Sequence, residues 1–232
     1  ALMKQVQNLP RVSAPVARLS FFVSYLENLG ALNSTPENLI NNKGDCIPLL
    51  TNSFLHWFET GKWADLKLLE LGSGNSTFYF SKFFKSVTSY ENNKKWFEAF
   101  QAKVPENVNY IYANQIRSEL KNEDLEKYDV ILVDAAENRA KIARVISDSG
   151  YSGLIFFDNS ECYRRGIDIF SQAGFFEIPF FGIKPVYDRM SCTSVMIKSE
   201  RLATWFTSDW NRLPGMMLSQ DHNAWDDENS NQ

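Results

Sequence analysis

Apolar residues recur along most of this chain in two alternating periods. From about residue 66 onward, apolar runs of five or six residues alternate with stretches in which apolar side chains recur every three or four positions. The short runs have the length of buried strands, and they predict strands at 66–71, 87–91, 108–113, 128–133 and 153–157. Strands that alternate with helices in this way predict a parallel sheet with helices on both faces.

The helical stretches and the last two apolar runs complete this picture. Helices are predicted at about 77–84, 96–104, 142–150 and 167–173. Two further strands, 175–181 and 194–197, are separated only by a loop at 182–193, so they are expected to form an antiparallel pair. The fold class that follows is α/β, a Rossmann-like doubly wound sheet, mostly parallel with an antiparallel last strand.

Two helices are predicted before the first strand. The first begins near Ser13-Ala14-Pro15 and ends at Gly30, and the second begins between Asp45 and Pro48 and ends at Gly61. Their apolar faces either cover the sheet or form a lid over a substrate. We therefore expect an N-terminal helical cap over residues 1–62, a main domain over 63–200 and a C-terminal extension over 201–232, partly disordered at its polar end.

Composition narrows the range of functions. Hydrophobic residues make up 44% of the 232 positions, enough for a sizeable core. The net charge of -4 gives no electrostatic footprint for nucleic acid or for an anionic membrane, and no apolar run is long enough to span one. Cys46, Cys162 and Cys192 are far apart and form neither a zinc pattern nor a disulfide framework, which predicts a cytoplasmic protein. With only two histidines, a histidine-rich metal site is excluded.

The segment from Leu66 to Thr77, LKLLELGSGNST, carries the main functional signal. An apolar run stops at Gly72-Ser73-Gly74, and a helical pattern follows, as in a strand, a glycine turn and a helix start. Gly72 and Gly74 let the backbone approach a ligand closely, and the free N–H groups of the helix start point toward it. The segment is therefore expected to hold a cofactor that contains adenosine.

Glu70 discriminates between two kinds of cofactor. A dinucleotide fingerprint has a third glycine where this chain has Thr77, and a pyrophosphate over the helix start would be repelled by the Glu70 carboxylate. The same carboxylate suits a cofactor with an amino group and a cationic sulfur. An NAD(P)-dependent oxidoreductase and a non-catalytic binding protein of this fold remain the alternatives.

The acid-x-Gly-x-Gly pattern, Glu70 to Gly74, resembles the glycine-rich motif of class I S-adenosylmethionine-dependent methyltransferases. Together with the order of strands and helices, the resemblance extends over about 66–198. GSGNST followed by YEN, with IPLLTNSFLHWF upstream and FDNS downstream, is similar to a bacterial group of methyltransferase-like proteins, some associated with surface glycan or secondary-metabolite pathways. The resemblance implies S-adenosylmethionine as cofactor and a small hydroxylated acceptor, such as a sugar.

Polar residues end each of the first five predicted strands: Glu70, Glu91, Asn114, Asp134 and Asp158. In an open parallel sheet, ligands bind beyond the carboxyl ends of the strands. By the resemblance, Glu91 accepts hydrogen bonds from the ribose hydroxyls, and Asn114 with Gln115 meets the adenine edge. The residues expected to bind the cofactor are Glu70, Gly72, Ser73, Gly74, Asn75, Ser76, Glu91, Asn92, Asn114 and Asp134.

A second group of oxygen atoms comes from Asp134 and from Asp158-Asn159. Two carboxylates and an amide oxygen suit Mg²⁺ or Ca²⁺, and the pattern is similar to the metal site of catechol and caffeoyl-CoA O-methyltransferases. This chain departs from that family, which has a lysine shortly after the first aspartate, because Glu137 precedes any lysine and the first one is Lys141. In the metal-free alternative, Asp134 orients the cofactor or acts as general base, and Asp158 and Asn159 bind acceptor hydroxyls.

These residues predict a methyltransferase that acts on oxygen of a small molecule, with Asp134 and Asp158 as catalytic residues. Trp57 is expected either in the core or in the pocket wall, and a homodimer is one assembly compatible with the sequence. Further candidates for contact with the acceptor lie after the fifth strand and in the last loop: Glu161, Tyr163, Arg164, Arg165, Tyr187, Asp188 and Arg189.

Overall fold

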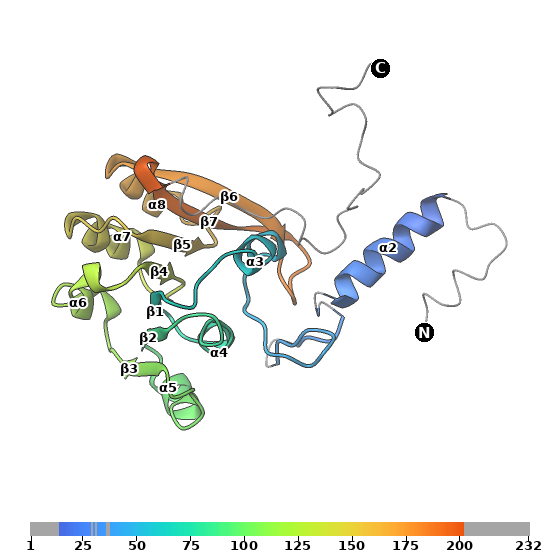
Figure 1. Ribbon diagram of the computed structural model, residues 1–232, viewed down its shortest axis with the longest axis horizontal. Helices are drawn as coiled ribbons and strands as arrows, with labels where there is room; N and C mark the ends of the chain where they lie inside the picture. The colour runs from blue at the N-terminus through green and yellow to red at the C-terminus, as the bar shows by residue number, and fades with distance from the viewer. Residues whose placement is uncertain (1–13, 29, 31, 36–37, 202–232) are drawn as a thin grey trace, which may run out of the picture.

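The computed structural model describes residues 14–28, 30, 32–35 and 38–201, and its centre is a seven-stranded sheet. The strands lie in the order β3-β2-β1-β4-β5-β7-β6 (Figure 1). In chain order they are β1 (Lys67–Leu71), β2 (Ser86–Glu91), β3 (Val108–Tyr112), β4 (Val130–Val133), β5 (Leu154–Asp158), β6 (Phe175–Ile183) and β7 (Met190–Lys198).

The pairing confirms the predicted sheet. Strands β1 to β5 pair in parallel, while β7 runs antiparallel to both of its neighbours, β5 and β6. The last two strands are longer than predicted, so the connecting loop shrinks to residues 184–189. Polar residues on β7, such as Ser191 and Thr193, hid this extension because they interrupt the apolar run.

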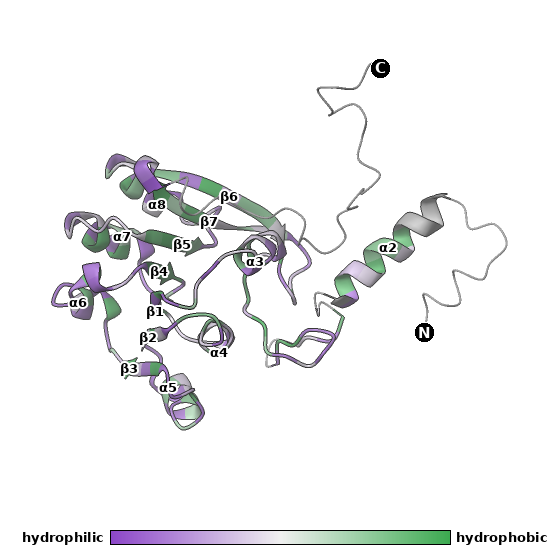
Figure 2. Cartoon of the chain, viewed as in Figure 1, coloured by the Kyte–Doolittle hydropathy of each residue, from purple (hydrophilic) through white to green (hydrophobic). Residues whose placement is uncertain are grey.

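Helices cover both faces of the sheet, as predicted. One face packs against α6 (Ile116–Leu120), α7 (Arg139–Asp148) and α8 (Arg164–Gln172). The other packs against α3 (Asn52–Glu59) and α4 (Asn75–Phe80), with α5 (Lys94–Phe100) beside β3. In Figure 2 the central strands β4 and β5, which lie between these layers, are coloured as hydrophobic. The short helix α6 and the 3-10 turn Leu125–Lys127 had no periodic pattern long enough to predict them.

Three predicted helix boundaries are wrong. Helix α3 begins at Asn52 and not between Asp45 and Pro48, because Thr51 is extended and its N–H donates to Thr193 Oγ1 on β7 at 3.1 Å. Upstream, the Asn41 side chain accepts from the N–H groups of Lys43 and Asp45 and folds that stretch into turns. Helices α4 and α5 end at Phe80 and Phe100, each four residues before its predicted end.

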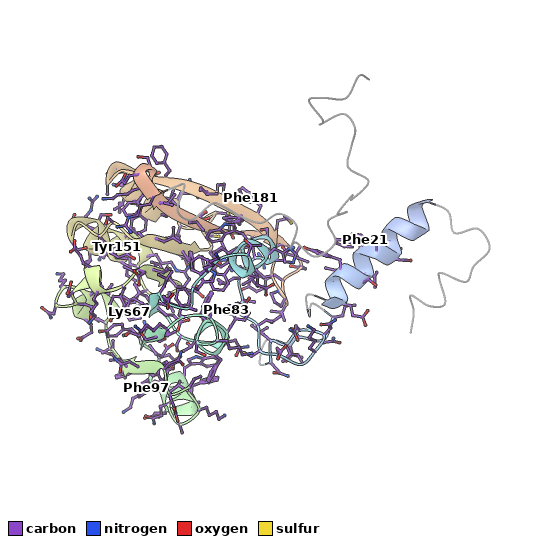
Figure 3. The ribbon with its side chains drawn as sticks, in the orientation of Figure 1. Phe21, Lys67, Phe83, Phe97, Tyr151 and Phe181 are labelled. Carbon is purple, nitrogen blue, oxygen red and sulfur yellow. The ribbon has the colours of Figure 1, made fainter. Side chains whose placement is uncertain are left out.

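Aromatic rings fill the space between α3, α4 and the sheet. Phe58 stacks on Trp63 with ring centroids 4.7 Å apart, and Phe54 meets Phe156 of β5 edge-on at 4.9 Å. Trp57 lies against Phe156 and Phe180 at 6.0 and 5.3 Å, so it belongs to this packing, the first of its two predicted roles. Figure 3 shows the side chains crowded between the layers.

Helix α2 (Ala14–Asn28) lies apart from the sheet (Figure 1). Its Tyr25 accepts a hydrogen bond from Asn52 and meets the His56 ring at 5.9 Å, whereas Leu19, Phe21 and Phe22 are exposed. The predictions for residues 1–12 and for the C-terminal extension lie outside the described residues, apart from Arg201. In the described part of the chain, no helix has the length and apolar character needed to cross a membrane.

Candidate functional site

The turn after β1 uses its two glycines for different reasons. Gly72 has a φ of 93°, and a Cβ there would lie 2.7 Å from Ala135 Cα and from the carbonyl oxygen of Asp134. Gly72 is therefore required by its packing against the end of β4. A Cβ on Gly74 would meet only Ser76 Oγ, at 4.0 Å. The space beside Gly74 is open, as the close approach of a ligand requires.

Glu70 is buried beneath this turn. Its Oε2 accepts hydrogen bonds from Thr77 Oγ1 of α4 at 2.5 Å and from Ser89 Oγ of β2 at 2.6 Å. Its Oε1 is also buried, and no donor in the described part of the chain reaches it with bonding geometry. A buried acceptor without a donor is costly, so the ionised form of this carboxyl group is poorly compensated in the absence of a nearby positive charge.

Burial raises the pKa of Glu70 to about 7, although hydroxyl groups of Ser76, Ser89 and Thr77 act in the opposite direction. The negative charge of Asp134 adds to the rise. A positively charged ligand beside Glu70 would lower this pKa, since it favours the ionised carboxylate. Binding of a cation beside Glu70 would therefore favour loss of the proton from its carboxyl group.

Glu91 ends β2 and reaches the same turn from the other side. Its Oε2 accepts from the Ser73 N–H at 3.1 Å and from Ser73 Oγ at 2.5 Å, and its Oε1 accepts from the Asn93 N–H at 2.6 Å. Tyr110 of β3 lies 2.8 Å from the same Ser73 hydroxyl. Glu70 and Glu91 therefore converge on one turn, as the rim prediction requires.

The other predicted cofactor residues lie around this turn with fewer contacts. Asn75 and Ser76 form the first turn of α4, where Ser76 is buried. Asn92 is partly buried after β2, and Asn114 is exposed after β3. All lie beyond the carboxyl ends of their strands. The structure thus brings these residues to one edge of the sheet, and their contacts with a cofactor stay a prediction.

Asp134 follows β4 and forms an ion pair with Arg139. Arg139 Nη2 lies 2.7 Å from Asp134 Oδ1, and the guanidinium also donates to the carbonyl oxygens of Ala135 and Asp158. The Tyr163 ring lies 4.4 Å from the guanidinium carbon of Arg139. Burial and the charge of Asp158 raise the pKa of Asp134, while Arg139 and Lys184 act against that rise.

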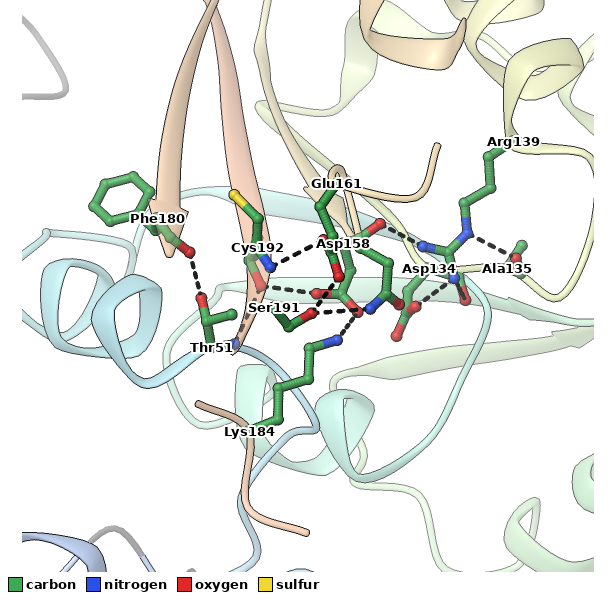
Figure 4. Close-up of polar contacts among 12 residues, drawn as sticks. Thr51, Asp134, Ala135, Arg139, Asp158, Glu161, Phe180, Lys184, Ser191 and Cys192 are labelled. Atoms are coloured by element: carbon green, nitrogen blue, oxygen red, sulfur yellow. Dashed lines mark hydrogen bonds and ion pairs between the residues drawn. The ribbon is translucent and has the colours of Figure 1, made fainter. Parts of the chain in front are cut away.

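Asp158 ends β5 and is fully buried, and both of its carboxylate oxygens are engaged (Figure 4). Oδ2 lies 2.5 Å from the Lys184 ammonium, and Oδ1 accepts from Thr193 Oγ1 at 2.7 Å. Lys184 is itself only 2% exposed. This geometry favours a role for Asp158 in holding Lys184 over direct contact with an acceptor.

Asn159 follows Asp158 with a positive φ of 51°. The amide orientation that satisfies its neighbours has Nδ2 donating to Asp158 Oδ2 at 3.0 Å and the oxygen accepting from Lys184 Nζ at 2.9 Å. Asn159 and Asp158 thus bind the same ammonium group.

The predicted metal site does not fit this arrangement. Asp158 Oδ2 and the Asn159 amide oxygen bind Lys184, and Asp134 is paired with Arg139. Among the described residues, no group of three His, Cys, Asp or Glu side chains is arranged to hold a metal ion. The oxygen ligands predicted for Mg²⁺ or Ca²⁺ are therefore brought together, but around side-chain cations.

Several candidate acceptor contacts have structural partners. Arg164 forms a bidentate ion pair with Glu177 of β6, and both N–O distances are 2.7 Å. Glu161 accepts hydrogen bonds from Ser191 Oγ and from the Cys192 N–H. Asp188 and Arg189 form an exposed pair at 3.8 Å. Of the remaining candidates, Tyr187 is half-exposed with its ring 5.7 Å from Lys184 Nζ, which places it beside the buried cation. Arg165 is exposed.

Sequence reasoning missed three residues of this site. Arg139 and Lys184 bind the two aspartates, and Glu137 accepts from the N–H groups of Ile116 and Arg117 at the start of α6. The position of Arg139, the first residue of α7 and five positions after Asp134, is a signal that could have indicated a partner for Asp134. Lys184 lies 26 positions from Asp158, and the pairing of β7 with both β5 and β6 brings the two residues together.

Comparison with known proteins adds a fold assignment. No protein-family model and no curated protein matches the chain. A provisionally assigned O-methyltransferase from Klebsiella pneumoniae has a similar structure, with a TM-score of 0.51 and 15% identity over 84% of this chain and 94% of that one. The Bacillus cereus O-methyltransferase in complex with S-adenosylhomocysteine is also similar, with a TM-score of 0.48 and 16% identity over 84% of this chain and 96% of that one. Fibrillarin from Methanococcus jannaschii, a pre-rRNA processing protein, has a TM-score of 0.45 and 20% identity over 64% of this chain and 75% of that one.

At this level of identity the Klebsiella structure shows the fold alone. Its likeness and the strand order confirm the predicted Rossmann-like methyltransferase fold. Fold does not determine the substrate, so the expectation that nucleic acid is not a partner still depends on the net charge of the chain.

Proposed function

We propose that this protein is an S-adenosylmethionine-dependent methyltransferase. The observation that carries the proposal is the convergence of Glu70 and Glu91 on the Gly72–Asn75 turn. Both carboxylates are held there by hydroxyl and N–H donors, and neither forms an ion pair with a lysine or arginine of the described residues. The turn is therefore a negatively charged site that a cationic ligand would complement.

The parts of the cofactor match different sides of this turn. Glu91 would accept from the ribose hydroxyls, exchanging its bond to the Ser73 hydroxyl for them. Glu70 is buried beneath the turn, so its carboxylate would attract the amino group and the sulfonium of the cofactor through its charge and not through direct contact. The open space beside Gly74 lets the ligand approach the backbone. A pyrophosphate would bring negative charge to the same carboxylates, which disfavours NAD(P).

We place the methyl acceptor beyond the ends of β4 and β5, beside Asp134. Asp134 is partly exposed and pairs with Arg139 through Oδ1, which leaves Oδ2 to accept the proton of an acceptor hydroxyl. The acceptor oxygen then forms the new C–O bond as the C–S bond breaks, and the sulfonium becomes a neutral thioether. Half-exposed Tyr187 would pack against a small hydroxylated acceptor such as a sugar.

The test is formation of S-adenosylhomocysteine with a panel of small hydroxylated acceptors, with and without EDTA. We expect turnover with at least one acceptor, and we expect Asp134→Asn to lower it by about two orders of magnitude, since a general base contributes about that factor. Asp148→Asn is the matched control, because Asp148 ends α7 and is exposed. Equal turnover in both variants would contradict the role of Asp134.

A further inference from the structure

Lys184 is a buried cation that no sequence pattern predicted. It is the first residue after β6, and its side chain is almost completely buried. A buried ammonium group requires a counter-charge and hydrogen-bond acceptors, because it has lost its hydration. Asp158 Oδ2 supplies the charge at 2.5 Å. The amide oxygen of Asn159 supplies a second acceptor at 2.9 Å.

These acceptors are two of the three groups that the sequence predicted as metal ligands. The third, Asp134, follows β4, which pairs in parallel with β5, and it is bound by Arg139 at 2.7 Å. In Figure 4 the Lys184 side chain reaches up to Asp158, with Asp134 on the far side of that carboxylate. The ammonium thus lies where oxygen ligands of this kind would place a cation.

We propose that Lys184 is a built-in cation that takes the place of a divalent metal ion at the ends of β4 and β5. The charges support this assignment: the carboxylates of Asp134 and Asp158 are balanced by Arg139 and Lys184. A divalent ion at this position would be repelled by Arg139 and Lys184 and would find both carboxylates already paired. Removal of the ammonium leaves a net negative charge around oxygen ligands, and the set becomes a metal site.

The consequence for the reaction depends on the proposed function. In a methyltransferase, a fixed cation at this edge attracts the acceptor oxygen as it loses its proton, without a bound metal. The site would then prefer acceptors with a hydroxyl group beside Asp134 and a second oxygen that reaches toward Lys184. The assignment of Lys184 as resident cation can be tested without any methyl transfer.

The experiment is a titration with Mn²⁺, followed by the paramagnetic resonance signal of the free ion. We expect wild type to show no Mn²⁺ binding at this site. Lys184→Ala should bind Mn²⁺ with an affinity on the order of tenfold or more above the detection limit for wild type, because a positive charge that repels the ion is lost. Lys184→Ala/Asp158→Asn should lose the binding again. Lys85→Ala is the matched control: it removes the same charge from an exposed lysine at the amino end of β2, on the opposite edge of the sheet.

Each outcome decides the proposal. Binding of Mn²⁺ to wild type that is abolished by Asp158→Asn would overturn it, as would a folded Lys184→Ala that binds no Mn²⁺. Where Lys184→Ala does not fold alone, circular dichroism with and without Mn²⁺ replaces the titration: restoration of the fold by the ion supports the proposal, and no effect contradicts it. The mixture contains neither cofactor nor acceptor, so a failure here is distinct from a failure to bind S-adenosylmethionine.

Discussion

The two halves of the site hold their carboxylates in opposite ways. At the glycine turn, Glu70 and Glu91 accept only from hydroxyl and backbone N–H groups of the described residues. At the ends of β4 and β5, Asp134 and Asp158 are each paired with a cation, Arg139 or Lys184. The first half is negatively charged, and the second is balanced.

This contrast indicates which half awaits a cationic ligand. Neutral donors stabilise a carboxylate without cancelling its charge, so the turn still attracts a sulfonium and an ammonium group. The second half already contains its cations and lacks an open position for another. Two sets of acidic strand ends that look alike in the sequence therefore have different electrostatic roles, and the following substitutions separate them.

The largest effect is expected from the buried pair. Asp158→Asn leaves the Lys184 ammonium buried without its counter-charge and should lower the free energy of unfolding by about 3–5 kcal/mol. Asp158→Asn/Lys184→Met should recover much of that loss, since it removes both charges. Denaturant unfolding at pH 7 measures these changes. Glu70→Gln leaves no buried cation without its counter-charge, so it should lower the free energy of unfolding far less. An equal loss in Asp158→Asn and Glu70→Gln would contradict the difference between the two halves of the site.

A smaller effect is expected from pH at Glu70. Its pKa is about 7 in the folded protein and close to 4.5 in the unfolded chain, so the folded state holds the proton more tightly. The resulting stability is fully present below pH 4.5 and is lost as pH rises toward and through 7. The loss is about 3 kcal/mol over this window, at about 1.4 kcal/mol per pKa unit.

Glu70→Gln removes the pH-dependent contribution of Glu70 to stability, because glutamine resembles the protonated acid and does not titrate. Unfolding free energies measured from pH 4.5 to 8 should therefore fall more steeply in wild type than in Glu70→Gln. Parallel plots of unfolding free energy against pH for the two proteins would show that Glu70 has an ordinary pKa and would contradict the effect of its burial.

Next in size is the effect of Glu91 on the cofactor. Glu91→Gln removes the charge from the predicted ribose contact and should weaken S-adenosylmethionine binding by about 2 kcal/mol, or roughly 30-fold. Equilibrium dialysis with labelled cofactor measures this. Glu98→Gln on α5 is the control, because Glu98 is exposed and interacts only weakly with Lys94, at 3.9 Å. Unchanged affinity in Glu91→Gln would exclude it from the cofactor site.

The smallest effect on stability is expected at Gly74. Gly74→Ala meets open space and should change the free energy of unfolding by less than about 1 kcal/mol, while hindering the cofactor. Gly72→Ala should cost more, because its Cβ collides with the backbone of Ala135 and its φ is positive. Thermal unfolding with and without S-adenosylmethionine compares the two. Equal stability loss in both variants would contradict the distinction between the glycines.

Local patterns in the sequence were enough to predict the sheet and the acidic rim. Apolar runs specify buried strands, and parallel strands bring Glu70, Glu91, Asp134 and Asp158 to one edge whatever the loops do. The partners of these acids could not be predicted in the same way. Lys184 reaches Asp158 through the pairing of β7 with both β5 and β6, and a lysine near a proline in a loop carries no signal of burial.

The most direct test of the account is calorimetric titration of the wild-type protein with S-adenosylmethionine and, separately, with NADH. We expect saturable one-to-one binding of S-adenosylmethionine and no binding of NADH, because the carboxylates at the turn attract the sulfonium and repel the pyrophosphate. Binding of NADH, or the absence of heat with S-adenosylmethionine, would contradict it.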